Sequence, residues 1–331
     1  MNLVFESIVF LVILGIVLFF VMALLSPFES LGWWAGWSKK SIDQEFDDDR
    51  LEQQQTQILV HNRPSISLVG SAPKRFLVYL RGIATADAQL SRREQGFLDH
   101  LFSYLPNSAI ISDVFPYSAT NNPLTGERTF ARLYQLLHNA RERYRNSLFS
   151  LLFVLRNLFQ VAVSGDGRYG PIYNAGIARA IGYSLLSNGY TIGCEQPIWV
   201  MGWSGGGQIS VGSARYLHRI FNAPVYVVSI GGVILDGPAI ADVEHLYHLE
   251  GSRDNFPRIG DFFSPGRWKI VKRSFWNQAW NAGRITVIDP GPMKHTGGQD
   301  YFDHKNKLSD GKTYAQRTAQ VIAEIVREVE S

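Results

Sequence analysis

The sequence predicts an α/β protein: a mostly parallel β-sheet with helices on both faces, preceded by one N-terminal transmembrane helix. Apolar runs of strand length alternate with amphipathic helical stretches from residue 75 onward, which is the order typical of a parallel sheet. A glycine-rich turn, residues 202–206, joins one of these strands to the helix that follows it. Near the N-terminus, residues 7–25 form an uncharged apolar stretch.

Length and composition fit one large folded domain. The 331 residues are 46% hydrophobic and 18% charged, with a formal net charge of +3. So small a charge provides no basic field, and we predict no nucleic-acid partner. The single cysteine, Cys194, excludes an intramolecular disulfide and a thiolate metal cluster. Because it stands in TIGCEQP without a nearby histidine, a small loop residue is favoured over a catalytic thiol.

Residues 7–25 are predicted to span a bilayer. At 1.5 Å per residue this helix covers roughly the 30 Å of hydrocarbon. A cleaved signal peptide would carry a basic segment first, whereas the residues before the span include Glu6 and no lysine or arginine. We therefore expect a retained single-pass anchor, with a buried core helix as the alternative.

The residues after the anchor indicate its orientation. Trp33, Trp34 and Trp37 form the aromatic belt expected at the headgroups, and Lys39 and Lys40 follow. The two lysines favour a cytoplasmic location for the rest of the chain, although an acidic run comes directly after them.

Three regions follow from these patterns. Residues 1–37 are the anchor and its tryptophan belt, residues 38–74 a polar linker, and residues 75–331 the globular domain, with a helical insertion at about 129–163. The segment from Asn146 to Val163 is nearly as apolar as the anchor but contains Arg156 and Asn157. A mid-helix arginine disfavours a second span. A buried or capping helix and an interfacial helix both remain open.

The predicted strands are short apolar runs ended by glycine, proline or polar residues. They are RFLVYLRG, SAIISDVF, PIWVMGWS, APVYVVSIGGV, VEHLYHLEG and RITVIDPG, in chain order from residue 75 to residue 291. Helices are predicted at 94–105, in two segments before the glycine-rich turn, at 208–221 and at 313–330. In the last of these, apolar side chains recur at helical spacing and would pack on the sheet: Val321, Ile322, Ile325, Val326 and Val329.

The turn Gly202-Trp203-Ser204-Gly205-Gly206 carries the clearest chemical signal. It matches GxSxG between a buried strand and a helix, an elbow that holds a serine in a strained conformation at a helix N-terminus. Small residues two before and two after the serine are required there, and Gly202 and Gly206 supply them. Ser204 is therefore the candidate nucleophile, and the Gly205 N–H is one candidate donor for an oxyanion hole.

This order of elements resembles the α/β-hydrolase superfamily, over residues 75 to the end. The resemblance implies an eight-stranded α/β-hydrolase fold and a Ser–Asp–His triad in chain order. Carried onto this sequence, Ser204 is the nucleophile, Asp254 in the turn Gly251-Ser252-Arg253-Asp254 is the acid, and His295 in the loop before the last helix is the base. The insertion here precedes the elbow, whereas the family commonly inserts its cap after the sixth strand.

Some assignments within this resemblance have rivals. Asp236, in ILDGP after the preceding strand, is an alternative acid, and His304 is the nearest rival base. The second oxyanion donor is expected from the loop after the first strand, where the family often has His-Gly. This chain has Arg81-Gly82-Ile83, so Gly82 and Ile83 are both candidates.

The leading functional hypothesis is hydrolysis of a carboxylic ester, of lipid or acyl type, through an acyl-enzyme on Ser204. An acyltransferase or a peptidase would use the same residues. A non-catalytic protein that binds a lipid or protein partner, or a chain that oligomerises through the apolar helix, is the competing class. The sequence has no HExxH, no GxxxxGK[ST] and no dinucleotide fingerprint, so we predict no metal and no cofactor. The expected partners are the bilayer, through residues 7–25, and an ester or lipid substrate; the oligomeric state is open.

Overall fold

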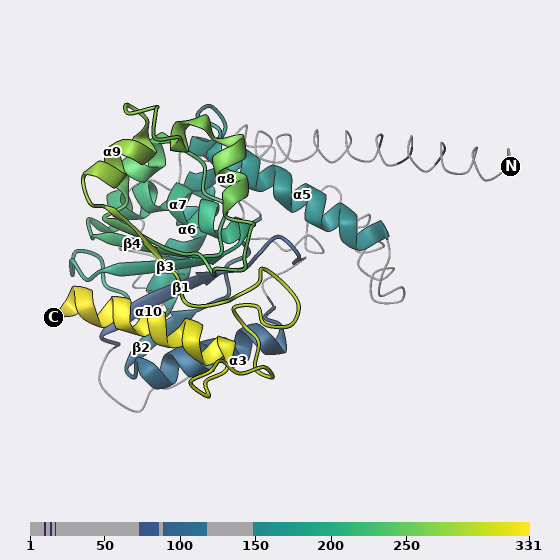
Figure 1. The fold of residues 1–331 in the computed structure, drawn as a ribbon. Helices are drawn as coiled ribbons and strands as arrows, with labels where there is room; N and C mark the ends of the chain where they lie inside the picture. Colours follow the sequence, from purple (N-terminus) through teal and green to yellow (C-terminus); the bar gives the residue numbers. More distant parts are fainter. Residues whose placement is uncertain (1–9, 11–13, 15–16, 18–72, 86–88, 118–147) are drawn as a thin grey trace, which may run out of the picture.

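The structure is a computed structural model that describes residues 73–85, 89–117 and 148–331, with Phe10, Leu14 and Val17 (Figure 1). Apart from a few positions, the predicted span, the polar linker and the first part of the predicted insertion, residues 129–147, lie outside the described residues. Within the described part, no helix combines the length and the apolar character needed to cross a membrane.

The centre of the molecule is a six-stranded sheet in the order β2-β1-β3-β4-β5-β6. Every neighbouring pair is parallel. The strands are β1 (Arg75–Leu80), β2 (Ser108–Ile111), β3 (Ile198–Trp203), β4 (Val225–Ile230), β5 (His245–Leu249) and β6 (Ile285–Ile288). The mostly parallel α/β architecture is as predicted, with six strands in the described residues where the resemblance implies eight.

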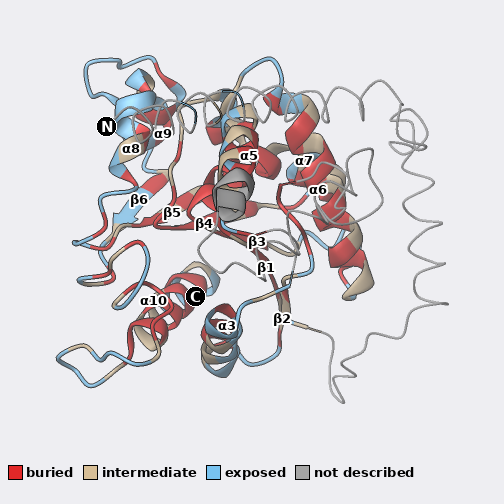
Figure 2. Cartoon of the chain, turned by 90° about the vertical axis from the view of Figure 1, so that its right-hand side faces the viewer, coloured by how far each residue is buried: buried red, intermediate tan, exposed pale blue. Residues whose placement is uncertain are grey.

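Helices cover both faces of this sheet (Figures 1 and 2). One face carries α3 (Arg92–Tyr104) and α10 (Tyr314–Glu330), which pack against each other. The other face carries α6 (Gly170–Ser187) and α7 (Gly205–Phe221), with α5 (Leu148–Gly165) packed on both. The shorter helices are η2 (Pro238–Asp242), α8 (Arg258–Phe263), η3 (Pro265–Arg267) and α9 (Phe275–Asn281).

Alternation along each strand divides the core between the two faces. In β1, Val78 and Leu80 belong to the cluster under α6 and α7, whereas Leu77 and Tyr79 belong to the cluster under α3 and α10. All four side chains are fully buried. A strand buried on both faces has no polar face, which is why β1 appears in the sequence as a continuous apolar run.

Two of the element boundaries that differ from the sequence prediction have a clear physical reason. Strand β2 stops at Ile111, because the residues after it leave the sheet as an irregular buried segment. Helix α7 begins at Gly205, three residues earlier than predicted. Glycine has a low intrinsic helix propensity, but here the close approach of the helix to the sheet admits only glycine, and packing overrides propensity.

The described side chains of α5 show where its two central polar residues, Arg156 and Asn157, lie. Arg156, Asn157 and Gln160 are buried in the domain, while Leu158 on the other side of the helix is 48% exposed. This half of the helix therefore packs on the globular domain through its polar side chains.

Candidate active site

The turn between β3 and α7 forms a sharp elbow with Ser204 at its tip. Ser204 has φ 54° and ψ −122°, a left-handed conformation that side-chain-bearing residues rarely adopt. Such a backbone costs about 1–3 kcal/mol and persists only where its surroundings fix it. The Ser204 N–H donates to Ile230 O at 3.0 Å, and its carbonyl accepts from the Gly207 N–H at 3.0 Å. The elbow is thus held by β4 and by the first turn of α7.

Glycines make this elbow possible. A Cβ on Gly202 would lie 2.3 Å from the Gly206 backbone, and a Cβ on Gly206 would lie 2.6 Å from Leu80 O. Neither contact can be relieved by a side-chain rotation, because both atoms struck are backbone. The two small positions of GxSxG are therefore required by the packing of α7 against β3 and the end of β1.

His295 lies within hydrogen-bond reach of both other predicted triad residues. Its Nε2 is 3.0 Å from Ser204 Oγ, and its Nδ1 is 3.0 Å from Asp254 Oδ2. A carboxylate can only accept, so Nδ1 carries the proton and Nε2 is left to accept from the serine hydroxyl. All three residues are nearly inaccessible to solvent. The structure brings together the serine, histidine and aspartate named from the sequence.

Asp254 is held by further donors that the sequence did not indicate. Its Oδ2 also accepts from Tyr301 Oη at 2.9 Å, and its Oδ1 accepts from the Phe256 N–H at 2.9 Å. The Tyr301 hydroxyl in turn accepts from the Gly251 N–H at 2.8 Å. Burial raises the pKa of Tyr301 far above its ordinary value, and the Asp254 carboxylate raises it further. The phenol therefore stays protonated and donates.

Two aromatic rings enclose the His295 imidazole. The Phe256 ring stacks on it with centroids 3.9 Å apart and an interplanar angle of 10°. The Trp203 ring lies at 6.2 Å and 27°. Because stacked rings restrict rotation about the side chain, they help to hold Nε2 toward Ser204. Neither aromatic residue was a sequence candidate; Phe256 stands two residues after Asp254 and Trp203 is the variable residue of GxSxG.

The loop after β1 lies directly against the elbow. Leu80 pairs with Gly202 in the sheet, so the residues that follow it reach the N-terminus of α7. A Cβ on Gly205 would lie 2.6 Å from Ile83 Cγ2, and a Cβ on Gly82 would lie 2.8 Å from the Trp203 ring. The three predicted oxyanion-hole residues, Gly205, Gly82 and Ile83, are therefore neighbours. The Gly205 N–H is the first of α7, ahead of the Gly207 N–H that bonds to Ser204 O, and at a helix N-terminus such a group has no intrahelical acceptor and can meet an anion.

The rival acid and base lie in other networks. Asp236 Oδ1 accepts from the Trp276 N–H at 2.7 Å, and its own N–H donates to Ser264 Oγ at 2.7 Å, near the start of α9. His304 lies over α3, with Nε2 2.9 Å from Arg93 O. Asp254 and His295 are the pair that the structure joins to Ser204.

The likeness of this chain to solved structures is weak. No family model matches the chain, and no curated protein matches it. Among solved structures, the crystal structure of esterase PE8 resembles it with a TM-score of 0.40 and 15% sequence identity, over 80% of this chain and 97% of that chain. Any assignment of function therefore rests on the geometry of residues in this chain.

Proposed function

We propose that this protein is a serine hydrolase of the α/β-hydrolase type that cleaves a carboxylic ester through an acyl-enzyme on Ser204. The observation that carries the proposal is the unbroken hydrogen-bond chain from Ser204 Oγ through the His295 ring to Asp254 Oδ2, with 3.0 Å at each step. A nucleophile and base within this reach, with the base oriented by a third group, is the arrangement that nucleophilic catalysis requires.

The mechanism follows from the positions of these atoms. Ser204 Oγ attacks the ester carbonyl while His295 Nε2 takes the serine proton, and Asp254 stabilises the imidazolium that results. The carbonyl oxygen becomes an oxyanion, for which the Gly205 N–H and an N–H of the 82–83 loop are the proposed donors. Collapse expels the alcohol, which takes the proton from Nε2. Water then attacks the acyl-enzyme by the same steps and regenerates Ser204.

The proposal extends to a membrane location. Residues 7–25 would anchor the chain in a bilayer and the globular domain would lie on the cytoplasmic side, next to lipid or acyl esters as substrates. In the described part of the chain, large apolar side chains are exposed around α8 and α9, among them Phe262 at 78% and Ile270 at 80%. Exposed apolar surface of this kind is common where proteins meet partners or membranes. An acyltransferase would use the same residues with an alcohol in place of water.

The test is covalent labelling of the detergent-solubilised full chain with a fluorophosphonate probe. Ser204→Ala is expected to abolish labelling, and His295→Ala to slow it by roughly 10²- to 10⁴-fold, the usual contribution of a general base. Ser213→Ala is the matched control, because Ser213 is a fully buried serine of the same helix that bonds only to Ser210 O in the described structure.

Labelling that disappears in the Ser204 variant and persists in the Ser213 variant would establish an activated serine at the elbow. Hydrolysis of p-nitrophenyl esters of increasing acyl length would then define the acyl preference. A well-folded wild-type protein that the probe does not label would overturn the proposal in favour of a binding protein.

A further inference from the structure

Helix α5 is hydrogen-bonded to the loop that follows β1 through a polar side chain in its middle. The side-chain amide of Asn157 donates to two carbonyls of this loop, Ile83 O at 2.8 Å and Thr85 O at 2.7 Å. Asn157 is fully buried, and so is Arg156 beside it. Buried polar side chains in a mainly apolar helix need partners, and for Asn157 these partners are loop carbonyls next to the elbow.

Arg156 determines which way the Asn157 amide faces. Arg156 Nη1 lies 3.1 Å from Asn157 Oδ1 and also donates to Tyr117 O. A guanidinium can only donate, so it orients the amide oxygen toward itself and the NH2 group toward the carbonyls of Ile83 and Thr85. The opposite orientation would place an oxygen against two carbonyl oxygens.

The same loop is held at its start by a second group. Tyr117 Oη donates to Arg81 O at 2.8 Å, and burial raises the pKa of Tyr117 well above its ordinary value, which keeps this donor protonated. In a planar trans peptide the C=O and the N–H point in opposite directions. Fixing the Arg81 carbonyl therefore fixes the direction of the Gly82 N–H, one of the two candidate donors. Fixing the Ile83 carbonyl fixes the peptide that follows Ile83, the other candidate.

We propose that Asn157 is a positioning residue for the oxyanion hole: oriented by Arg156, its amide holds the loop at residues 83 and 85 so that the candidate donor, the N–H of Gly82 or Ile83, meets the oxyanion formed at Ser204. This inference rests on the proposed hydrolase function and adds a structural role for α5. The apolar helix and the catalytic elbow are thereby joined through one side chain, so a change at Asn157 reaches the transition state without touching Ser204, His295 or Asp254.

The test compares Asn157→Asp with a matched control, Asn174→Asp, in the full chain. Asn174 is also a nearly buried asparagine, but its side chain bonds to Ser164, between α5 and α6, and not to the loop. Asn157→Leu, which keeps the volume and removes both polar atoms, is a second variant. Thermal unfolding of each variant verifies that it folds.

With a p-nitrophenyl ester as substrate, both Asn157 variants are expected to lower kcat by roughly 10- to 10³-fold with little change in KM. The largest loss in this range is that seen when an enzyme loses one oxyanion donor completely. The pH profile of kcat should keep its shape, because the triad is intact. The specific readout is the rate ratio between an ester and its thionoester, whose sulfur is a poor acceptor for oxyanion-hole donors. This ratio should fall in the Asn157 variants and stay at the wild-type value in Asn174→Asp.

Hydrogen exchange of the amides of residues 82–85 separates this inference from the proposed function. Faster exchange there in Asn157→Asp than in Asn174→Asp is expected whether or not the protein is an esterase. An unchanged ester-to-thionoester ratio in an active Asn157 variant would overturn the positioning role and leave the hydrolase standing. An inactive wild type would overturn the hydrolase, and equal exchange in the two variants would show that Asn157 does not hold the loop.

Discussion

Asp254 is surrounded by donors whose joint effect is to fix one carboxylate oxygen opposite His295. Tyr301 contributes to this most directly, because its hydroxyl donates to the same Oδ2 that His295 Nδ1 approaches, at 2.9 Å and 3.0 Å. It also accepts the Gly251 N–H, so the tyrosine joins the acid to the end of β5. Among the triad residues, Tyr301 hydrogen-bonds to the acid alone, so it would act on catalysis through orientation of the base.

Tyr301→Phe is therefore expected to lower kcat/KM for a p-nitrophenyl ester by about tenfold, since a hydrogen bond to a charged group contributes roughly 1.5–3 kcal/mol and only part of it is specific to the transition state. The buried Gly251 N–H also loses its acceptor, which should reduce the free energy of unfolding by about 1–3 kcal/mol. Steady-state kinetics and chemical denaturation measure the two effects.

Tyr190→Phe is the control for this prediction. Tyr190 is an equally buried tyrosine whose hydroxyl donates to Gln196 O, away from the site. It should lose stability and keep its activity. Equal losses of kcat/KM in the two variants would show that Tyr301 has no role beyond general packing.

At the level of elements, the loop between β6 and α10 carries the base and is folded around Asp303. The Asp303 carboxylate accepts from the backbone N–H groups of Gln299, Lys305 and Asn306 and from the Asn306 amide. Burial raises the pKa of Asp303, but these hydrogen bonds lower it more, and the result lies well below the ordinary value. The ionised carboxylate thus stabilises the loop that presents His295.

An aspartate whose pKa is lower in the folded state than in the unfolded state makes the folded protein less stable at acidic pH. The contribution is fully present above the unfolded-state pKa, which is about 3.9 for aspartate, and it is lost as the pH falls below that value toward the folded-state pKa. The thermal unfolding midpoint of wild type should therefore fall more steeply below about pH 4 than that of Asp303→Asn. Parallel curves for the two proteins would contradict this role for Asp303.

The elements that the sequence predicts well are those whose pattern comes from burial. Strands β1, β3 and β4 are nearly continuous apolar runs, and Ser204 is marked by the glycines around it, so their positions follow from local sequence. Tyr301 and Asn157 are different, because a loop and a helix far apart in the chain from Ser204 bring them to the site. Nothing in the residues next to Tyr301 or Asn157 indicates which carboxylate or carbonyl each will meet.

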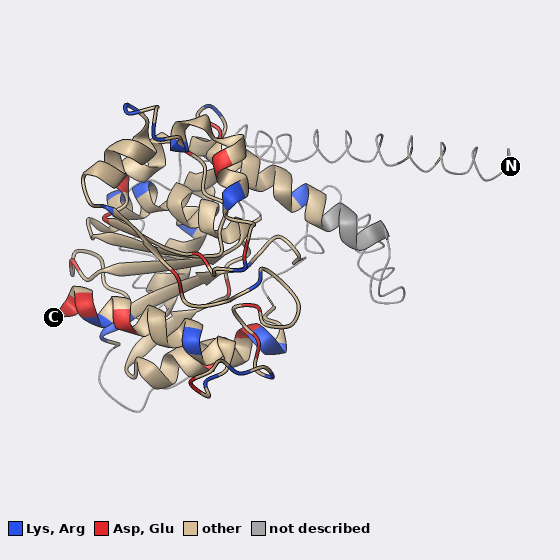
Figure 3. Ribbon diagram, in the orientation of Figure 1, with Lys and Arg blue, Asp and Glu red and all other residues tan. Residues whose placement is uncertain are grey.

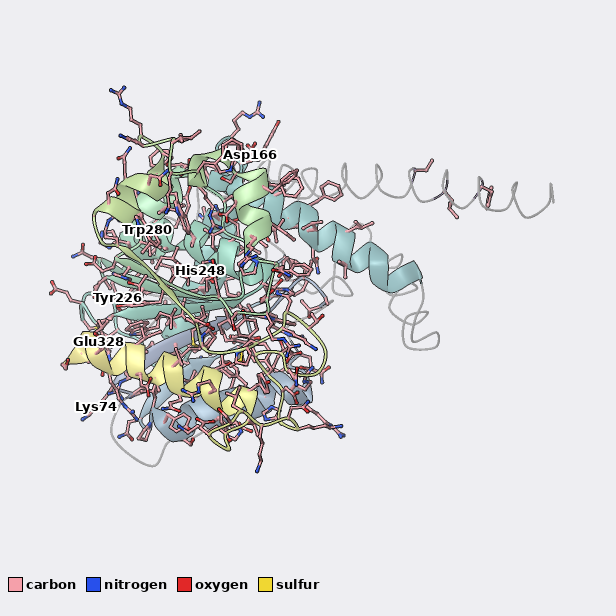
Figure 4. The ribbon with its side chains drawn as sticks, in the orientation of Figure 1. Lys74, Asp166, Tyr226, His248, Trp280 and Glu328 are labelled. Carbon is pink, nitrogen blue, oxygen red and sulfur yellow. The ribbon has the colours of Figure 1, made fainter. Side chains whose placement is uncertain are left out.

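At the scale of the whole molecule, the candidate site lies at one end of the sheet. The site lies at the carboxyl ends of the strands, where open parallel sheets place their ligands. Lys74, before β1, and Glu328, near the end of α10, lie at the opposite edge (Figure 4). Arg75 and Glu330 pair there with 2.6 Å between Nη2 and Oε2, which joins the start of β1 to the end of α10.

The surface before α9 has the composition of a membrane contact. Residues 268–273, Trp-Lys-Ile-Val-Lys-Arg, are all exposed, and the cations of this loop lie at the edge of the molecule (Figure 3). In the described part of the chain, Lys269, Lys272 and Arg273 form no ion pair. Apolar side chains interleaved with unpaired cations suit an anionic bilayer surface, with about 1 kcal/mol for each cation near it. A protein anchored by residues 7–25 would meet such a surface without dissociating from the membrane.

The prediction concerns depth in the bilayer, measured on the full chain in nanodiscs. In a Cys194→Ser background, which removes the only native cysteine, an environment-sensitive fluorophore is attached at Ile270→Cys or at Phe102→Cys. Phe102 is 44% exposed on α3, across the sheet from α9. The emission of the label at position 270 should shift to the blue and be quenched by spin-labelled lipid in discs with phosphatidylglycerol, and the label at 102 should do neither.

The double variant Lys269→Glu with Lys272→Glu should remove the difference between the two labels, because the lysine charges attract this surface to the lipid. Identical spectra at positions 270 and 102 would mean that the anchor holds the domain free of the bilayer, so that substrate reaches Ser204 from the aqueous phase.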